Sequence, residues 1–289
     1  MDVRRIVVDG LGVRVVEAAP ERETDDPVLL VHGLGGWAEN WRGVMPGIAA
    51  TGRRAIAVDL PGFGESERPR RARHFDPDDP LYAAFVFAAL DALGIARAHI
   101  AGHSLGGAVA YTAAVWRPER VRSLTLVAPG GLVRDLIREL RILTLPGMGL
   151  LARFRRSPRL ARAVLYSCFF DPSKCPEELV GEAARYGTPS AGEMIRALRS
   201  AVSFFGGIRD DIRRPWIARA PRYAGPALVV WGREDAVVPS SAAAEVGHVT
   251  PQAQVRILSP CGHLVMVECR DAFLDVFLPF LESSGTMDA

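Results

Sequence analysis

The chain has 289 residues, of which 49% are hydrophobic and 24% are charged, and its formal net charge is +2. This is the composition of a globular protein with a substantial buried core, and it excludes a disordered or collagen-like chain. Because the net charge is close to zero, we expect no nucleic-acid partner.

The first five residues contain no apolar run of the kind that begins a signal peptide. No window reaches the roughly 18 uninterrupted apolar residues of a membrane span. We therefore expect a cytoplasmic protein. The four cysteines are dispersed without metal-ligand spacing, and in a reducing compartment we expect free thiols. The alternative is a disulfide between Cys168 and Cys175.

Two β-rich runs, 3–8 and 13–18, open the chain, and Asp9-Gly10 between them predicts a hairpin. Later runs are short and apolar, as in strands buried on both faces of a sheet. These runs are 28–31, 55–58, 99–101, 124–127 and 227–230, and another strand ends at 256–258. Helical patterns separate the runs at 80–93, 105–116 and 271–281. This alternation predicts an α/β protein with a mostly parallel sheet covered on both faces.

The alternation stops after residue 131, and the segment 132–222 is helical, arginine-rich and broken by seven prolines. We expect an inserted helical cap at 132–222, with 1–131 and 223–289 forming the core. The cap carries 17 Arg and Lys against 9 Asp and Glu, whereas the rest carries 18 against 24. Its basic surface is either an ordinary solvated face or one that meets anionic substrates or lipid headgroups.

The segment 101–107 reads AGHSLGG and contains G-x-S-x-G with Ser104 at its centre. It lies between a predicted strand and a predicted helix, which is the context in which this motif exposes a nucleophile. The N-terminal N–H groups of the helix stabilise developing negative charge. We therefore predict that Ser104 is a catalytic nucleophile, the alternative being a serine that only caps the helix.

A serine hydroxyl needs a base, and the chain has six histidines. We predict that the base is His263, which follows the last strand in a glycine-containing loop at the same sheet end as Ser104. The other five suit different roles: His99 lies in a strand, His103 should point away from Ser104, His74 lies in a polar, Arg-rich loop, His248 lies on a surface helix, and His32 should brace its loop by hydrogen bonding.

The acid that orients His263 should follow another strand, and WGRED at 231–235 follows the strand 227–230. We favour Asp235, deeper in the loop, over Glu234. The chain order Ser, Asp, His is that of the α/β-hydrolases. For the oxyanion hole we predict the main-chain N–H groups of Leu34, in the glycine-rich loop 32–36, and of Leu105.

The sequence resembles the cap-bearing α/β-hydrolases, a group that holds esterases, lipases, cofactor-free haloperoxidases, carbon–carbon bond hydrolases and epoxide hydrolases. The resemblance rests on HGLGG at 32–36, DLPGFGES at 59–66, GHSLGG at 102–107, WGRED at 231–235 and GH at 262–263. It implies an eight-stranded, mostly parallel sheet flanked by helices, with no metal and no organic cofactor. Epoxide hydrolases and haloalkane dehalogenases of this group carry aspartate at the position of Ser104, so those activities are disfavoured.

We accordingly expect a serine hydrolase that cleaves a small carboxylic ester or acyl substrate through an acyl-enzyme on Ser104. A carbon–carbon bond hydrolase, a thioesterase and a perhydrolase would use the same residues, and a ligand-binding receptor on a hydrolase scaffold is a further alternative. Binding to a membrane surface through the basic cap is not expected, and the sequence gives no oligomeric state. The apolar residues at 140–154 and the pairs Phe169-Phe170 and Phe204-Phe205 either pack the cap onto the core or form a substrate pocket.

Overall fold

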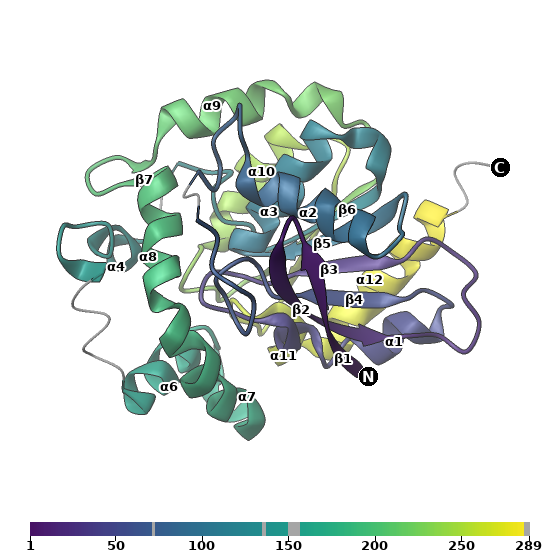
Figure 1. Cartoon of the computed structure of the whole chain (residues 1–289), viewed down its shortest axis with the longest axis horizontal. Helices are drawn as coiled ribbons and strands as arrows, with labels where there is room; N and C mark the ends of the chain where they lie inside the picture. The colour runs from purple at the N-terminus through teal and green to yellow at the C-terminus, as the bar shows by residue number, and fades with distance from the viewer. Residues whose placement is uncertain (71–72, 135–136, 150–156, 286–289) are drawn as a thin grey trace.

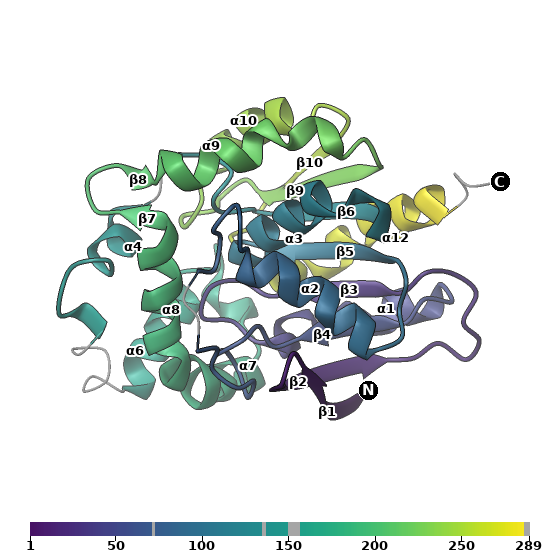
Figure 2. The same cartoon turned by 45° about the horizontal axis from the view of Figure 1, so that its top comes forward.

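The computed structural model describes residues 1–70, 73–134, 137–149 and 157–285. Its centre is an eight-stranded sheet in the order β1-β2-β4-β3-β5-β6-β9-β10, which confirms the predicted fold class (Figure 2). The strands are β1 (Asp2–Val8), β2 (Leu11–Ala18), β3 (Val28–Val31), β4 (Ala55–Val58), β5 (Ala98–His103), β6 (Val121–Val127), β9 (Ala227–Gly232) and β10 (Gln254–Leu258).

The six neighbouring strands β4, β3, β5, β6, β9 and β10 pair in parallel. In contrast, β1 pairs with β2, and β2 with β4, in antiparallel orientation. The β1–β2 connection is the predicted hairpin, since Asp9 and Gly10 both have positive φ, at 47° and 77°. All residues of β3, β4, β5 and β9 are buried. Helices cover both faces of these strands, which explains why their sequences are continuous apolar runs.

Side chains that alternate along the strands divide the core into two layers. Leu29 and Val31 of β3 pack in the cluster that contains α2, α3 and α10. Val28 and Leu30 pack in the other, with α1 and α12. The helical elements of the core are η1 (Ala38–Trp41), α1 (Met45–Ala50), α2 (Leu81–Ala92), α3 (Leu105–Trp116), η2 (Pro118–Arg120), η6 (Ser240–Ala242), α10 (Ala243–Val249), α11 (Val265–Glu268) and α12 (Arg270–Gly285).

Between β6 and β9 the chain leaves the sheet. We refer to residues 132–222 as the insert; its helices α4, α6, α7 and α8 lie together at one side of the sheet (Figure 1). Its described elements are α4 (Arg138–Ile142), α6 (Pro158–Tyr166), η3 (Pro172–Lys174), α7 (Glu177–Glu182), the π-helical turn η4 (Ala183–Gly187), α8 (Thr188–Ala201), β7 (Val202–Ser203), β8 (Gly207–Ile208), α9 (Asp210–Ala218) and η5 (Ala220–Arg222).

Hydrogen bonds accepted by two carboxylates of the insert attach it to the core. Glu182 of α7 accepts from Trp37 Nε1 at 2.8 Å and from Arg42 Nη2 at 2.9 Å. Glu193 of α8 bonds to His74 Nε2 at 2.7 Å, and both side chains are fully buried. His74 does occur in an Arg-rich stretch, but its ring is inside the protein.

The expectation of four free thiols is wrong. Cys261 and Cys269 form a disulfide, while Cys168 and Cys175 are free. The bonded pair is eight residues apart, and the turn that leads into α11 brings the two sulfur atoms together. The alternative pairing of Cys168 with Cys175 is not formed either.

Among the described residues, no helix is long and apolar enough to cross a membrane.

The first turn of α3 lies against the end of β3. A Cβ atom on Gly106 would stand 2.3 Å from the carbonyl oxygen of Val31 and 2.5 Å from that of His32. Backbone atoms of a buried strand have no room to move, so only glycine allows this approach. Gly181 in α7, by contrast, has open space where a Cβ would lie.

We expect Gly106→Ala to lower the free energy of unfolding by about 2–3 kcal/mol, because overpacking of a close backbone contact costs about that much. Gly181→Ala is the matched control and should leave stability unchanged or raise it by about 0.5 kcal/mol through the lower backbone entropy of alanine. Urea unfolding of both variants measures this. Equal stabilities would contradict the packing argument.

Candidate active site

Ser104 occupies the turn between β5 and α3 in an unusual backbone conformation, with φ 53° and ψ −116°. A non-glycine residue keeps such a positive φ only where its surroundings hold it. Here Ser104 N donates to Val127 O at 2.9 Å, and Ser104 O accepts from Gly107 N at 2.9 Å and Gly130 N at 3.0 Å. The strained turn is thus tied to β6 and to the loop that follows it.

A glycine before the serine is also required. A Cβ on Gly102 would lie 2.0 Å from the carbonyl oxygen of Gly106 across the turn. The G-x-S-x-G spacing therefore reflects two close backbone approaches, one within the turn and one between α3 and β3.

The structure brings Asp235 and His263 together, 28 residues apart in sequence. His263 Nδ1 lies 2.7 Å from Asp235 Oδ2, and both side chains are buried. A carboxylate oxygen can only accept, so Nδ1 carries the proton and Nε2 keeps its lone pair. This is the tautomer that a general base requires.

Asp235 has every acceptor position occupied. Its Oδ1 accepts from Val237 N and Val238 N, each at 2.8 Å, and its Oδ2 accepts from Trp231 Nε1 at 3.1 Å as well as from His263. The carboxylate is therefore held in one orientation.

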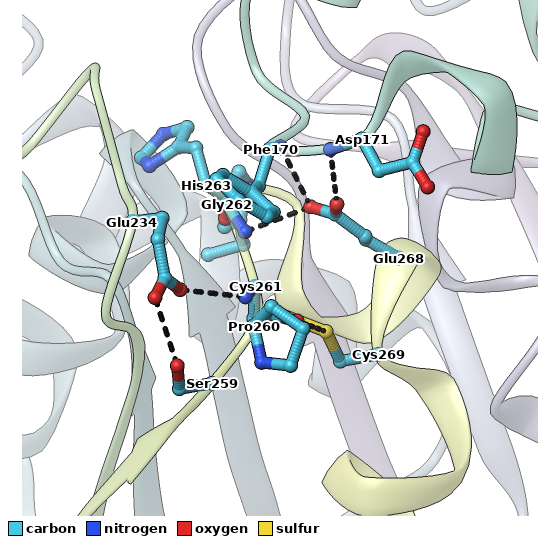
Figure 3. The surroundings of a disulfide bond; sticks show 11 residues. Phe170, Asp171, Glu234, Ser259, Pro260, Cys261, Gly262, His263, Glu268 and Cys269 are labelled. Atoms are coloured by element: carbon cyan, nitrogen blue, oxygen red, sulfur yellow. Dashed lines mark hydrogen bonds between the residues drawn. A yellow bond between two sulfur atoms is a disulfide. The ribbon is translucent and has the colours of Figure 1, made fainter.

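Glu234, the alternative acid, has a different role. Its carboxylate accepts from Ser259 Oγ and Cys261 N, both at 2.8 Å. Both contacts lie in the loop that leads to His263, so Glu234 supports that loop from one side without touching the imidazole (Figure 3).

Ser104 and His263 are not joined directly. Within the part of the chain that is described, Ser104 Oγ makes no hydrogen bond to His263 Nε2. Such bonds are often long before substrate binds and shorten in the reacting complex. The two residues are linked through His103, which precedes Ser104 and whose ring lies 4.6 Å from that of His263.

The ring of His103 supports the backbone of His263. Its Nε2 lies 3.0 Å from the carbonyl oxygen of His263 and donates to it. Burial, together with the adjacent His263, holds the pKa of His103 well below its usual range. The ring is consequently a neutral support for the backbone of His263.

The main-chain amides of Leu34 and Leu105 belong to the loop after β3 and to the first residue of α3. Both residues line the same cavity as Ser104. Among the described residues, neither main-chain N–H donates to another protein group. Two unpaired donors beside a serine hydroxyl are the feature that an oxyanion hole needs.

His32 braces the loop that carries Leu34. Its Nε2 accepts from Leu60 N at 2.9 Å, so its Nδ1 donates to Gly33 O at 2.8 Å. Burial lowers the pKa of His32 to about 4, against the opposing effect of the Gly33 bond. Asp59 fixes the end of the same loop by accepting from Ala38 N at 2.7 Å.

Ser104 lines an apolar cavity that is partly open to solvent. Its walls come from α3, from the loop after β6 and from the insert. Arg213 is the one charged side chain in the described lining; it donates to Leu132 O at 2.9 Å and pairs with Glu245. The lining residues are Leu34, Phe75, Ser104, Leu105, Ala108, Thr112, Gly130, Gly131, Leu132, Leu140, Ala197, Leu198, Ala201, Val202, Ile208, Ile212, Arg213, Trp216, Ile217 and Val238.

The apolar residues expected at the start of the cap take different positions. Leu140 lines the cavity, whereas Phe169 is buried against the core and Phe170 and Phe205 are exposed. Leu150, Leu151 and Phe154 lie outside the described residues. Some of these apolar residues therefore pack the cap onto the core, as Phe169 does, and others line a pocket, as Leu140 does.

Sequence reasoning missed three features near the site. Trp231 donates to Asp235 from the strand that precedes it. Glu268 accepts three backbone N–H groups beside His263. Trp216 of the insert lines the cavity. A signal existed only for Trp231, which stands four residues before the acid. In the described residues, no three His, Cys, Asp or Glu side chains gather as they would around a metal ion.

A family model described as the alpha/beta hydrolase fold matches residues 26–268. The chain belongs to this family.

Relatives in the family carry out several reactions. The chain is 31% identical over 268 residues to a 2-hydroxy-6-oxo-6-phenylhexa-2,4-dienoate hydrolase of Burkholderia cepacia, covering 89% of this chain and 87% of that protein. It is 34% identical over 260 residues to a dihydrolipoyllysine-residue acetyltransferase component of the acetoin cleaving system of Pseudomonas putida; the match covers 90% of this chain but only 64% of that protein. Among solved structures, a bacterial membrane phospholipase A, described as a virulence factor, aligns with a TM-score of 0.76 and 26% identity, over 99% of this chain and 87% of that one. The family and these relatives support a serine hydrolase.

The free energy of unfolding at acidic pH should depend on histidines that are buried in their neutral form. Burial, with the nearby charge of Arg53, lowers the pKa of His99 to about 3, and its Nδ1 bonds to Ser123 Oγ at 2.8 Å. Between about pH 6.5 and pH 3 the unfolded chain binds a proton at His99 that the folded protein does not, so stability falls with falling pH in this window. Asp59, whose pKa burial raises to about 6, has the opposite effect below that pH.

We therefore compare wild type with His99→Asn, in which the amide replaces the bond to Ser123 and Asp59 is unchanged. From pH 7 to pH 5.5 the wild type should lose about 1 kcal/mol more unfolding free energy than the variant. Urea denaturation at the two pH values measures the difference. Parallel losses in the two proteins would show that His99 is not the group responsible.

Proposed function

We propose that this protein is a serine esterase that hydrolyses a neutral carboxylic ester through an acyl-enzyme on Ser104. The observation that carries the proposal is the apolar cavity that begins at Ser104, beside the unpaired amides of Leu34 and Leu105. The bond between His263 and Asp235 adds a base in the correct tautomer.

In the acylation step, Ser104 Oγ attacks the ester carbonyl carbon while His263 Nε2 removes the hydroxyl proton. The carbonyl oxygen becomes an oxyanion that accepts from the N–H groups of Leu34 and Leu105. The carbon–oxygen bond to the alcohol then breaks, and His263 returns its proton to the departing alkoxide. Asp235 keeps Nδ1 protonated and stabilises the imidazolium throughout.

In the deacylation step, water takes the place of the alcohol. His263 Nε2 removes a proton from the water as its oxygen attacks the acyl carbon. The second tetrahedral intermediate collapses, Ser104 Oγ leaves with the proton from His263, and the carboxylic acid departs. The residues return to their starting protonation states, and one water has been consumed for each ester.

The residues of α3 that line the cavity favour an unbranched acyl group of medium length. Leu105, Ala108 and Thr112 line it from one face of α3. Thr112 lies seven positions after Leu105 in the helix, so the distance between them along the helix axis is about 10 Å at 1.5 Å per residue. Carbon–carbon bonds of about 1.5 Å advance slightly less than their length in an extended chain, so about eight carbons fill this distance. Thr112 Oγ1 donates its hydrogen bond to Val109 O, so the hydroxyl does not require a polar partner on the acyl group.

We further propose that residues 132–222 act as a cap that sets substrate choice, with 1–131 and 223–289 as the catalytic core. Ala197, Leu198 and Ala201 of α8 line the cavity together with residues of α3. Small side chains at two of these positions leave room for a chain between the helices. Larger side chains there would shorten the pocket.

A carbon–carbon bond hydrolase is the second candidate, because the Burkholderia cepacia relative acts on a dienoate. Such a substrate is a carboxylate and needs a cation in its pocket. The lining here contains Arg213 alone as a charged group among the described residues, and Glu245 and Leu132 O already engage it. A neutral ester therefore fits better. A thioester or a peracid-forming reaction would use the same groups.

Hydrolysis of p-nitrophenyl esters from acetate to palmitate by wild type and Ser104→Ala tests the proposal. We expect wild-type kcat/KM to rise to a maximum near octanoate and to fall for longer chains. Ser104→Ala should lower it by at least about a thousand-fold, because the nucleophile is lost. No ester turnover by a folded wild type, with turnover of a ring-fission dienoate, would replace the esterase with the second candidate. No turnover of either would favour the receptor alternative.

The two neighbouring acids give a matched pair of variants. Asp235→Asn should lower kcat by about a thousand- to ten-thousand-fold, because an amide favours the wrong tautomer of His263. Glu234→Gln should lower kcat by less than about ten-fold, since its contacts are to Ser259 and the amide of Cys261. Steady-state kinetics on the preferred ester measures both. A larger loss for Glu234→Gln would reverse the assignment of the acid.

A further inference from the structure

The loop that carries His263 is attached to the insert as well as to the sheet. His263 N and Leu264 N both donate to Cys168 O, at 2.8 and 3.2 Å. The chain on either side closes on itself through the Cys261–Cys269 disulfide. Residues 168–171 of the insert therefore form one wall of the histidine loop (Figure 3).

Glu268 holds the two segments together. Its Oε2 accepts from Gly262 N at 2.7 Å and from Phe170 N at 3.1 Å, and its Oε1 accepts from Asp171 N at 2.7 Å. The side chain is only 7% exposed. One amide belongs to the residue before His263 and the other two belong to the insert, so a single carboxylate spans the junction.

The junction leaves little room for movement. A Cβ on Gly262 would lie 2.5 Å from Phe170 N and 2.9 Å from Glu268 Oε2. The imidazole of His263 points away from Glu268, on the other side of the loop (Figure 3). Glu268 thus touches neither the imidazole nor the cavity, and any effect on the reaction must pass through the backbone of residues 262 and 263.

From these contacts we infer that Glu268 is a positioning residue for the general base, and that it couples the insert segment 168–171 to the orientation of His263. The inference rests on the proposed function, since it assigns His263 as the base. Hydrogen bonds fix the other groups of His263: its N to Cys168, its O to His103 and its Nδ1 to Asp235. A displacement of Gly262 would therefore move the backbone and imidazole of His263 relative to Ser104.

Glu268→Gln tests the inference, because an amide nitrogen cannot accept and at least one of the three N–H groups loses its partner. Glu182→Gln is the matched control. Glu182 also joins the insert to the core, through Trp37 and Arg42, but contacts nothing in the histidine loop. Glu268→Asp is the second variant; it keeps the charge but shortens the reach, and serves if the glutamine variant does not fold.

Three readouts are made on variants shown to be folded by their thermal transitions. Ester kcat should fall about ten- to a hundred-fold in Glu268→Gln with KM changed less than two-fold, since displacement of a catalytic group by about 1 Å costs up to about a hundred-fold. The acid limb of kcat/KM should move to lower pH, because an imidazole held less well by Asp235 is harder to protonate. Labelling of Ser104 by a fluorophosphonate should slow in parallel. Glu182→Gln should match wild type in all three.

Equal kcat, acid limb and labelling rate in wild type and both Glu268 variants would overturn the inference. Equal losses in Glu182→Gln would also overturn it, because they would reflect general loosening of the insert. Failure of the proposed function has a different signature, in which wild type itself neither hydrolyses esters nor reacts with the fluorophosphonate.

Discussion

The backbone of Ser104, held at φ 53°, is the constraint around which the site is built. A residue with a Cβ pays about 1–3 kcal/mol for such a conformation, so neighbouring contacts must stabilise it. Its N–H and C=O are bound by β6, by α3 and by the loop after β6. Glycines at 102 and 106 remove the side chains that would otherwise separate these segments. The turn therefore exposes the serine hydroxyl because the sheet and the helix are packed unusually closely.

Hydrogen bonds from three segments hold His263 in position. Asp235 orients the ring, His103 binds the carbonyl oxygen and Cys168 binds the amide. These partners come from the turn after β9, from the serine turn and from the insert. A shift in any of the three segments changes the direction of the Nε2 lone pair. Because a catalytic group must be held within about 0.5 Å of its productive position, displacement of any of these segments would disturb the proposed proton transfer.

Much of this arrangement could be predicted from the sequence. Strands, helices and the Ser104, Asp235 and His263 positions have local signals: apolar runs, a glycine spacing and loops that follow strands. Contacts between distant segments have no such signal. Glu268 meets Phe170 across 98 residues and His74 meets Glu193 across 119. His74 illustrates the problem, since polar neighbours in sequence suggested a polar environment while its ring packs on Tyr82 inside the protein. The disulfide was missed for a related reason, because cysteine spacing does not reveal which turn will bring two thiols together.

The choice of substrate at Ser104 depends on the scarcity of charged groups in the described cavity wall. A serine, an imidazole and two amide donors can cleave esters, thioesters or carbon–carbon bonds, so these groups alone do not choose among them. The choice lies in the groups that bind the rest of the substrate. In the described wall, apolar side chains come from both α3 and α8, and Arg213 is already paired with Glu245. Placing a carboxylate there would leave a buried charge without a partner, which costs far more than an apolar chain gains by burial. Among the described residues, an apolar wall of this kind favours a neutral substrate over an anionic one, and the proposed ester specificity rests on that preference.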